Sequence, residues 1–118
     1  MKKKDNIFTR KLKWSENGLL GLIMVIITLN ILNGLDYLTT MTALPLGAIE
    51  LNPIMNYLIN NDLFFFFKVL LGGAFLTYLL IRSYKKNGKV TALTTGLLVV
   101  LILSIVVMNN FLVIIQLI

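Results

Sequence analysis

Three long apolar blocks alternate with short polar segments along the chain. The first block starts near Gly18 and continues, with more polar positions, to about residue 44; the others span about residues 63–81 and 90–118. At about 1.5 Å of rise per residue, each block is long enough as a helix to cross a hydrocarbon core of about 30 Å. Backbone groups in lipid are hydrogen-bonded internally, which favours helices. The pattern therefore predicts an all-α integral membrane protein with three transmembrane helices.

The connection at residues 45–62 predicts a short interfacial helix between the first and second spans. Pro45 and Gly47 interrupt the apolar block, and Asn52-Pro53 is typical of a helix start, because Asn is a favoured N-cap and Pro suits the first helical position. Apolar residues then recur at helical spacing with asparagines between them. A helix with one apolar face suits the membrane surface. An irregular loop is the alternative.

Composition supports a membrane location. Of the 118 residues, 58% are hydrophobic and 14% are charged, whereas a soluble domain is about half apolar and about a quarter charged. The chain has neither Cys nor His, which excludes disulfides, thiolate chemistry and the commonest zinc sites. We find no nucleophile motif, phosphate-binding loop or metal-ligand spacing. We therefore expect no cofactor, no metal and no enzymatic activity.

The net charge of +6 is concentrated at two places that flank apolar blocks. Basic residues cluster in the tail at residues 1–17 and again between Arg82 and Lys89, whereas residues 45–62 carry only the acidic Glu50 and Asp62. Positively charged flanks stay in the cytoplasm. We predict a multi-pass plasma-membrane protein with a cytoplasmic N-terminus and an extracytoplasmic C-terminus. The same placement of charge argues against a nucleic-acid partner.

The chain is expected to consist of a basic cytoplasmic tail, residues 1–17, and one transmembrane domain, residues 18–118. Phe8 and Trp14 lie among the basic residues of the tail, where aromatic rings suit contact with lipid headgroups. An unstructured tail attracted to anionic lipid is the alternative. A signal peptide is disfavoured, because the apolar run is too long and no convincing cleavage site follows it.

Polar residues at membrane depth are the main candidates for a functional site. At about 100° per residue, several polar positions of the first block share one helix face, which we call the polar stripe: Asn30, Asn33, Asp36, Tyr37 and Thr40. Lys68 in the second block and the pair Asn109-Asn110 in the third lie at a similar depth from the outer side, from the helix rise of about 1.5 Å per residue. We therefore predict a polar cluster in the outer half of the membrane, with these members: Asn30, Asn33, Asp36, Glu50, Asn52, Lys68 and Asn109.

Asp36 and Lys68 allow two interpretations. They could form a structural ion pair with Asn33 and Asn109 as neighbours, since an unpaired charge at the membrane centre costs about 2.5–3.5 kcal/mol. Lys68 could also extend to the interface without a partner. Alternatively, the cluster could bind a lipid headgroup, an ion or a helix of another protein. Glu50 could approach Lys68 or pair with Asp36, although nothing else supports acid–base catalysis by such carboxylates.

Small residues in the second block mark a candidate for close helix packing: Gly72, Gly73 and Ala74. Charged side chains are absent from the inner-half segments 19–27, 75–81 and 97–103, which counts against a proton relay through one protomer. Three helices bury little surface against each other. Beside the lipid bilayer, we therefore expect a homo-oligomer or another membrane protein as partner.

Several of these residues occur in a characteristic order: Leu29-Asn30, Leu32 to Asp36, Thr39 or Thr40, Gly47 to Pro53, and Phe67-Lys68. This order resembles a family of small prokaryotic membrane proteins, domain of unknown function 5658. The likeness covers roughly residues 29–80, and its most specific part is the set Asp36, Glu50, Asn52-Pro53 and Lys68. The resemblance implies a helical fold in a membrane and implies no particular activity.

The sequence thus predicts a small multi-pass membrane protein that acts as an accessory or interaction subunit, with the polar stripe bonded to another helix. An oligomeric small transporter, channel or lipid-binding protein is the alternative. A bacteriocin-immunity or stress-related membrane peptide is a third alternative, which rests only on size and charge.

Overall fold

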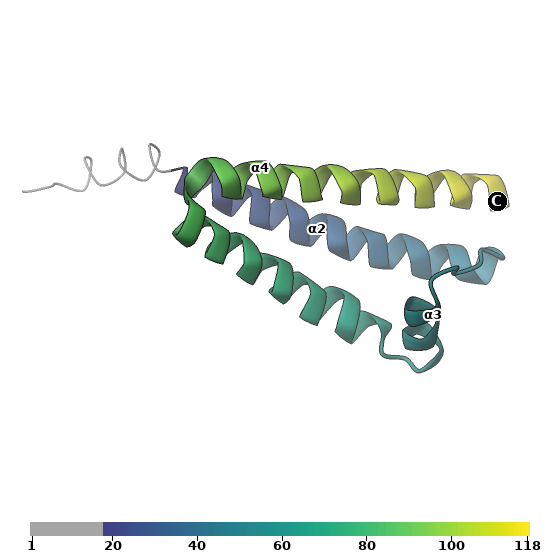
Figure 1. The fold of residues 1–118 in the computed structure, drawn as a ribbon. Coiled ribbons are helices and arrows are strands. Elements are labelled where there is room, and N and C mark those ends of the chain that lie inside the picture. Colours follow the sequence, from purple (N-terminus) through teal and green to yellow (C-terminus); the bar gives the residue numbers. More distant parts are fainter. Residues whose placement is uncertain (1–17) are drawn as a thin grey trace, which may run out of the picture.

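The computed structural model describes residues 18–118, so the predicted tail at residues 1–17, with Phe8 and Trp14, lies outside the described residues. All regular elements in the described part are helical (Figure 1), and no strand occurs among them. In order they are α2 (Leu19–Ala43), the 3-10 turn η1 (Leu44–Leu46), α3 (Pro53–Asn60), the π-helix η2 (Phe66–Leu71) and α4 (Gly72–Leu117). The prediction of an all-α chain is confirmed.

α4 reverses direction at Gly88. The φ and ψ angles of Gly88 are 85° and 178°, and Figure 1 shows the chain turning back at this point. Glycine suits this backbone conformation because it has no Cβ to clash with the neighbouring carbonyl. The break between the second and third apolar blocks, expected over residues 82–89, is shorter than predicted, since the helix continues from Arg82 through Asn87. α4 therefore consists of a first arm, residues 72–87, and a second arm, residues 89–117.

Length and apolar composition identify two helical stretches in residues 18–118 that could cross a membrane, Leu19–Leu46 and Phe66–Leu117. The sequence predicts three spans, and the counts differ because the second and third apolar blocks form one helical stretch that contains the break at Gly88. Large apolar side chains such as Met24, Leu101 and Ile105 are more than half exposed along these stretches. Soluble monomers rarely expose apolar patches beyond a few hundred Å², so this surface is compatible with lipid.

α2 and the two arms of α4 converge at the end of the bundle near Gly88 and diverge toward α3 (Figure 1). We call these ends the Gly88 end and the α3 end. The start of α2 lies at the Gly88 end, because a Cβ on Gly18 would be 3.1 Å from the Cβ of Lys89. Buried apolar side chains fill the space between these helices: Leu22, Leu29, Leu80 and Ala92.

Two glycines allow close contact between α4 and α2. A Cβ on Gly73 would lie 2.6 Å from Oδ1 of Asn30, and one on Gly96 would lie 2.5 Å from Cγ1 of Val25. Of the predicted packing residues, Gly73 is therefore in contact with α2. Gly72 meets only a backbone oxygen of its own segment, and Ala74 is exposed. Gly96, which was not among the predicted packing residues, also packs closely against α2.

The predicted helix in the first connection is present as α3. It begins at Pro53, and the Oδ1 atom of Asn52 accepts hydrogen bonds from the backbone N–H groups of Ile54 and Met55, at 3.0 and 3.4 Å. This is the N-cap that the sequence predicts. The chain reaches α3 through the segment 47–52, which starts at Gly47 with a φ of 111°.

Candidate functional site

The predicted ion pair between α2 and η2 is present. The Nζ atom of Lys68 lies 2.7 Å from Oδ2 of Asp36. The side chain of Asp36 is 10% exposed and that of Lys68 is 20% exposed. The side chain of Asp36 is therefore largely enclosed, while part of the Lys68 side chain remains accessible.

Asn110 of the second arm holds the other oxygen of the Asp36 carboxylate. Its Nδ2 donates to Oδ1 of Asp36 at 3.0 Å, and the same amide lies 3.0 and 3.2 Å from the Oγ1 atoms of Thr39 and Thr40. The predicted contact of Asn109 with the ion pair is not formed, because the hydrogen bond comes from Asn110; Asn109 lines a neighbouring cavity instead. Successive helical residues point about 100° apart, so the side chain of Asn109 is turned away from Asp36 and is exposed.

Asn33 holds the backbone of Lys68, whose side chain is paired with Asp36. The Nδ2 atom of Asn33 donates to the backbone oxygen of Lys68 at 2.9 Å, and Asn33 is buried. Lys68 belongs to the π-helix η2, a wide turn of a kind that is frequent at functional sites. Two residues of the polar stripe, one helical turn apart, thus determine both the backbone and the ammonium position of Lys68.

Asn30 lies one turn closer to the Gly88 end and does not reach the ion pair. Its Nδ2 donates to Oγ1 of Thr77 at 3.0 Å and to the backbone oxygen of Ile26 at 2.9 Å. Gly73 leaves the space for its amide. Asn30 therefore joins α2 to the first arm of α4, outside the group around Asp36.

Glu50 approaches the group from the segment 47–52, whereas Asn52 remains outside it. The Oε1 atom of Glu50 accepts a hydrogen bond from the backbone N–H of Asn52 at 2.9 Å. Within residues 18–118, Glu50 forms no ion pair with Lys68 or with another cation, so the direct contact between Glu50 and Lys68 is not formed. Asn52 is exposed and caps α3.

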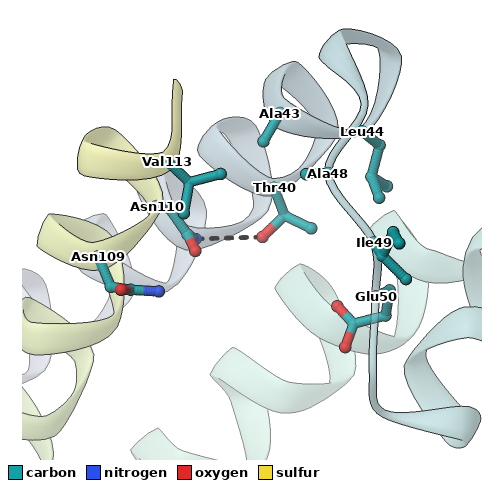
Figure 2. A pocket seen from close by; sticks show the side chains of 9 residues that line it. All are labelled: Thr40, Ala43, Leu44, Ala48, Ile49, Glu50, Asn109, Asn110 and Val113. Atoms are coloured by element: carbon teal, nitrogen blue, oxygen red, sulfur yellow. Dashed lines mark hydrogen bonds between the residues drawn. The ribbon is translucent and has the colours of Figure 1, made fainter. Parts of the chain in front are cut away.

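Two adjoining cavities open at the α3 end, and we call them together the polar pocket. One measures about 320 Å³ and is lined by Asp36, Glu50, Lys68 and Asn110 among others. The other measures about 280 Å³, and Figure 2 shows the Glu50 carboxylate across it from the hydrogen bond between Asn110 and Thr40. Both cavities share Thr40, Ile49, Glu50 and Asn110. The pocket thus combines charged groups from α2, η2 and the segment 47–52.

A third cavity, which we call the apolar groove, lies between α3 and the start of the first arm. It measures about 320 Å³ and is lined mainly by apolar residues: Asn33, Met55, Leu58, Phe67, Lys68, Gly72, Phe75 and Leu76. It shares Met55 and Lys68 with the polar pocket. Lys68 therefore stands at the junction between a polar and an apolar cavity.

The chemistry of the pocket is that of binding by charge and hydrogen bonding. It presents two carboxylates, an ammonium group, a primary amide and a hydroxyl group. Among residues 18–118, no three His, Cys, Asp or Glu side chains are grouped so that they could hold a metal ion. The arrangement is suited to a ligand that carries charge and donors of its own.

Helical phase could have identified Asn110. Leu103 packs against the core and Val107 is buried, and Asn110 follows them after seven and three residues. This spacing continues one helix face. Asn109 instead follows Ile102 and Ile105, which are both about 60% exposed. The apolar groove gave no comparable signal, because it depends on how α3 lies beside η2.

One protein-family model matches the chain, that of Domain of unknown function (DUF5658), over residues 24–116. The match runs from α2 to the end of α4 and so includes the third apolar block, which lies beyond the likeness found at residues 29–80. Comparison with curated proteins and with solved structures finds no match. Because the family model covers most of its length, the chain belongs to the DUF5658 family.

Proposed function

We propose that this chain is a plasma-membrane protein of three spans that binds a small polar ligand or a lipid headgroup in the polar pocket. The observation that carries the proposal is the Glu50 carboxylate, which has no ion-pair partner among the described residues and lines the same cavity as the partly exposed side chain of Lys68. Charged groups at such depth are functional candidates. No catalytic step is part of the proposal.

The reversal at Gly88 supports three crossings. The stretch 66–87 and the second arm, residues 89–117, each exceed the about 20 residues that a helix needs to span a bilayer. The basic residues from Arg82 to Lys89 lie at the Gly88 end, and the acidic Glu50 and Asp62 lie toward the α3 end. By the positive-inside rule, the Gly88 end and the N-terminus are cytoplasmic, while the polar pocket and the C-terminus face outward.

Binding explains the geometry better than passage across the membrane through one protomer. The apolar residues Leu22, Leu29, Leu80 and Ala92 fill the bundle toward the Gly88 end. A polar solute that reached Lys68 would therefore meet a packed apolar core beyond it. A transporter or channel would need further protomers to provide a path.

A pocket-filling variant tests the proposal. Ile49 lines both cavities of the polar pocket and is 81% exposed, so Ile49→Trp should fill the pocket without disturbing the core. Ile54→Trp is the matched control, because Ile54 is also exposed on the first connection and lines neither cavity. Native mass spectrometry of protein extracted into lipid nanodiscs should show a bound molecule in the wild type and in the control. The Ile49→Trp protein should lack it, and equal occupancy in both variants would contradict the proposal.

An accessory or interaction subunit is a second candidate, and Asn109 is the observation that favours it. The structure bonds the polar stripe within the chain, through Thr77, Lys68 and Asn110, so the stripe is not free for another helix. Asn109 is exposed and has no hydrogen-bond partner in residues 18–118. An amide at membrane depth gains by bonding across helices. A partner helix, or a second copy of this chain, would provide that bond.

Affinity purification in mild detergent tests this second candidate. A partner or homo-oligomer that depends on Asn109 should be lost in Asn109→Leu. It should persist in Gln116→Leu, which removes another exposed amide from the second arm. Identical assemblies in both variants would remove the candidate.

A further inference from the structure

We propose that the ligand is a zwitterionic phospholipid whose headgroup joins a phosphate to a primary amine, as in phosphoethanolamine. This inference rests on the proposed function of the polar pocket and names the class of ligand. It follows from the order of three chemical environments along one path: the Glu50 carboxylate, the Lys68 ammonium group and the apolar groove.

Lys68 is suited to the phosphate. An ammonium group has three N–H donors, and the described contacts of Lys68 use one of them, to Oδ2 of Asp36. The remaining donors have no protein acceptor among residues 18–118, and 20% of the side chain is exposed. Charge-assisted hydrogen bonds to phosphate oxygens are short and strong. A phosphate at this point would satisfy these donors.

Glu50 is suited to the amine. One of its oxygens accepts the backbone N–H of Asn52, and the other has no partner among the described residues. The larger cavity of the polar pocket carries two carboxylates, Asp36 and Glu50, against one ammonium, Lys68, which gives a charge of 1 − 2 = −1. A phosphate alone would increase this negative charge, and a simple cation would leave the donors of Lys68 unused. A zwitterion satisfies both ends.

The apolar groove is suited to an acyl chain. It shares Lys68 and Met55 with the polar pocket, and its wall includes Phe67, Phe75 and Leu76. Phe75 is 61% exposed on the first arm, so the groove is open at the surface that would face lipid. In a phospholipid the phosphate lies between the amine and the acyl chains. Lys68 occupies the corresponding place between Glu50 and the groove.

The position of Lys68 is fixed before any ligand binds. Asn33 holds its backbone oxygen, Asp36 holds its ammonium group, and Asn110 holds Asp36. Fixed donors lose little conformational entropy on binding. This preorganisation also keeps the carboxylate of Asp36 from competing for the amine of the ligand, because Lys68 and Asn110 already occupy its oxygens.

The test compares binding of defined lipids to the delipidated full chain, by native mass spectrometry in detergent. The panel is phosphatidylethanolamine, phosphatidylglycerol, which lacks the amine, and soluble glycerophosphoethanolamine, which lacks the acyl chains. Phosphatidylethanolamine should bind at least about tenfold more tightly than either, since a hydrogen bond to a charged group contributes that much. Glu50→Gln keeps an acceptor for Asn52 and removes the charge, so it should abolish the preference over phosphatidylglycerol.

One groove variant and two control variants complete the test. Asp62→Asn removes a carboxylate from the same connection outside the three cavities, and it should leave the preference intact. Phe75→Ala should weaken binding of phosphatidylethanolamine and leave that of glycerophosphoethanolamine unchanged, whereas Phe111→Ala, away from the groove, should alter neither.

Three outcomes would overturn the inference. Phosphatidylglycerol could bind as tightly as phosphatidylethanolamine, which would exclude the role of the amine. The soluble headgroup could bind as tightly as the lipid, which would exclude the acyl chain and indicate a free zwitterion. A bound molecule of another class could be displaced by Ile49→Trp, in which case the pocket still binds a ligand but the lipid assignment is wrong. Failure of the proposed function itself would give a different result from these three outcomes, because Ile49→Trp would then displace no bound molecule.

Discussion

Asn33 on α2 donates a hydrogen bond of 2.9 Å to the backbone oxygen of Lys68, inside the π-helix η2. One helical turn further along α2, Asp36 binds the ammonium group of the same lysine. Lys68 is therefore a central point of the fold as well as of the polar pocket. Variants at this position affect both stability and binding, and double-variant designs are needed to separate the two.

The Asp36–Lys68 pair should show strong energetic coupling. Asp36→Leu leaves the ammonium of Lys68 unpaired, and Lys68→Met leaves an enclosed carboxylate, so each single change should lower the unfolding midpoint in detergent. The double variant should be less destabilised than the sum of both, by about 1–3 kcal/mol. Additive single effects would contradict a direct interaction. Asp62→Asn, at an exposed carboxylate, should change the midpoint little.

Asn110 and Asn109 form a matched pair of adjacent asparagines with different environments. Asn110→Leu removes the hydrogen bond to Oδ1 of Asp36 and should destabilise the isolated chain by about 1–3 kcal/mol. Asn109→Leu removes an amide without a described partner and should have little effect on the monomer. Thermal unfolding of both variants checks the order. A larger loss at Asn109 would reverse our assignment.

Gly96 and Gly34 should respond to alanine in opposite directions. A Cβ on Gly96 would lie 2.5 Å from Cγ1 of Val25, so Gly96→Ala should destabilise the bundle by about 1–3 kcal/mol. Adding Val25→Ala should relieve the clash and recover part of the loss. A Cβ on Gly34 would meet nothing within 4 Å, and alanine favours helix by about 1 kcal/mol. Gly34→Ala should therefore raise the unfolding midpoint, and a fall at Gly34 would argue against this packing.

Single cysteines test the proposed topology, because the chain contains no Cys. Asn56 in α3, Asn87 beside Gly88 and Gln116 near the C-terminus are all exposed. In intact cells, a membrane-impermeant maleimide should label Asn56→Cys and Gln116→Cys. It should label Asn87→Cys only after permeabilisation. Labelling of Asn87→Cys alone in intact cells would reverse the orientation, and protection of Gln116→Cys would contradict a third crossing.

The ion pair could be predicted from sequence because charge and depth leave Asp36 and Lys68 as natural partners, even though the wide turn that makes Lys68 face α2 could not be predicted. Asp36 and Lys68 are charged, lie at a similar distance from the same connection and have no nearer partner in lipid. The choice between Asn109 and Asn110 depends on rotation about the helix axis, where an error of one residue turns a side chain by about 100°. The depth of a residue in the membrane is therefore easier to predict than the direction in which its side chain points from the helix.

Other features depend on contacts between elements that lie far apart in sequence. The apolar groove exists because α3 lies beside η2, and no pattern within either segment indicates this. The sequence of Phe66–Leu71 does not indicate a π-helix rather than an α-helix. The charged segment from Arg82 to Lys89 did indicate a break between the second and third apolar blocks, although the helix before Gly88 is longer than the second block predicts.

The wide turn of η2 has a consequence for the facing of the first arm. Lys68 contacts Asp36 and Gly73 contacts Asn30, so two residues five positions apart both meet α2. In a regular α-helix, residues five apart point about 140° away from each other, and one of them would turn away from α2. Hydrogen bonds of the i→i+5 kind reduce that angle. Removal of one residue from Phe66–Leu71 would thus rotate Lys68 away from its carboxylate rather than merely shorten the helix.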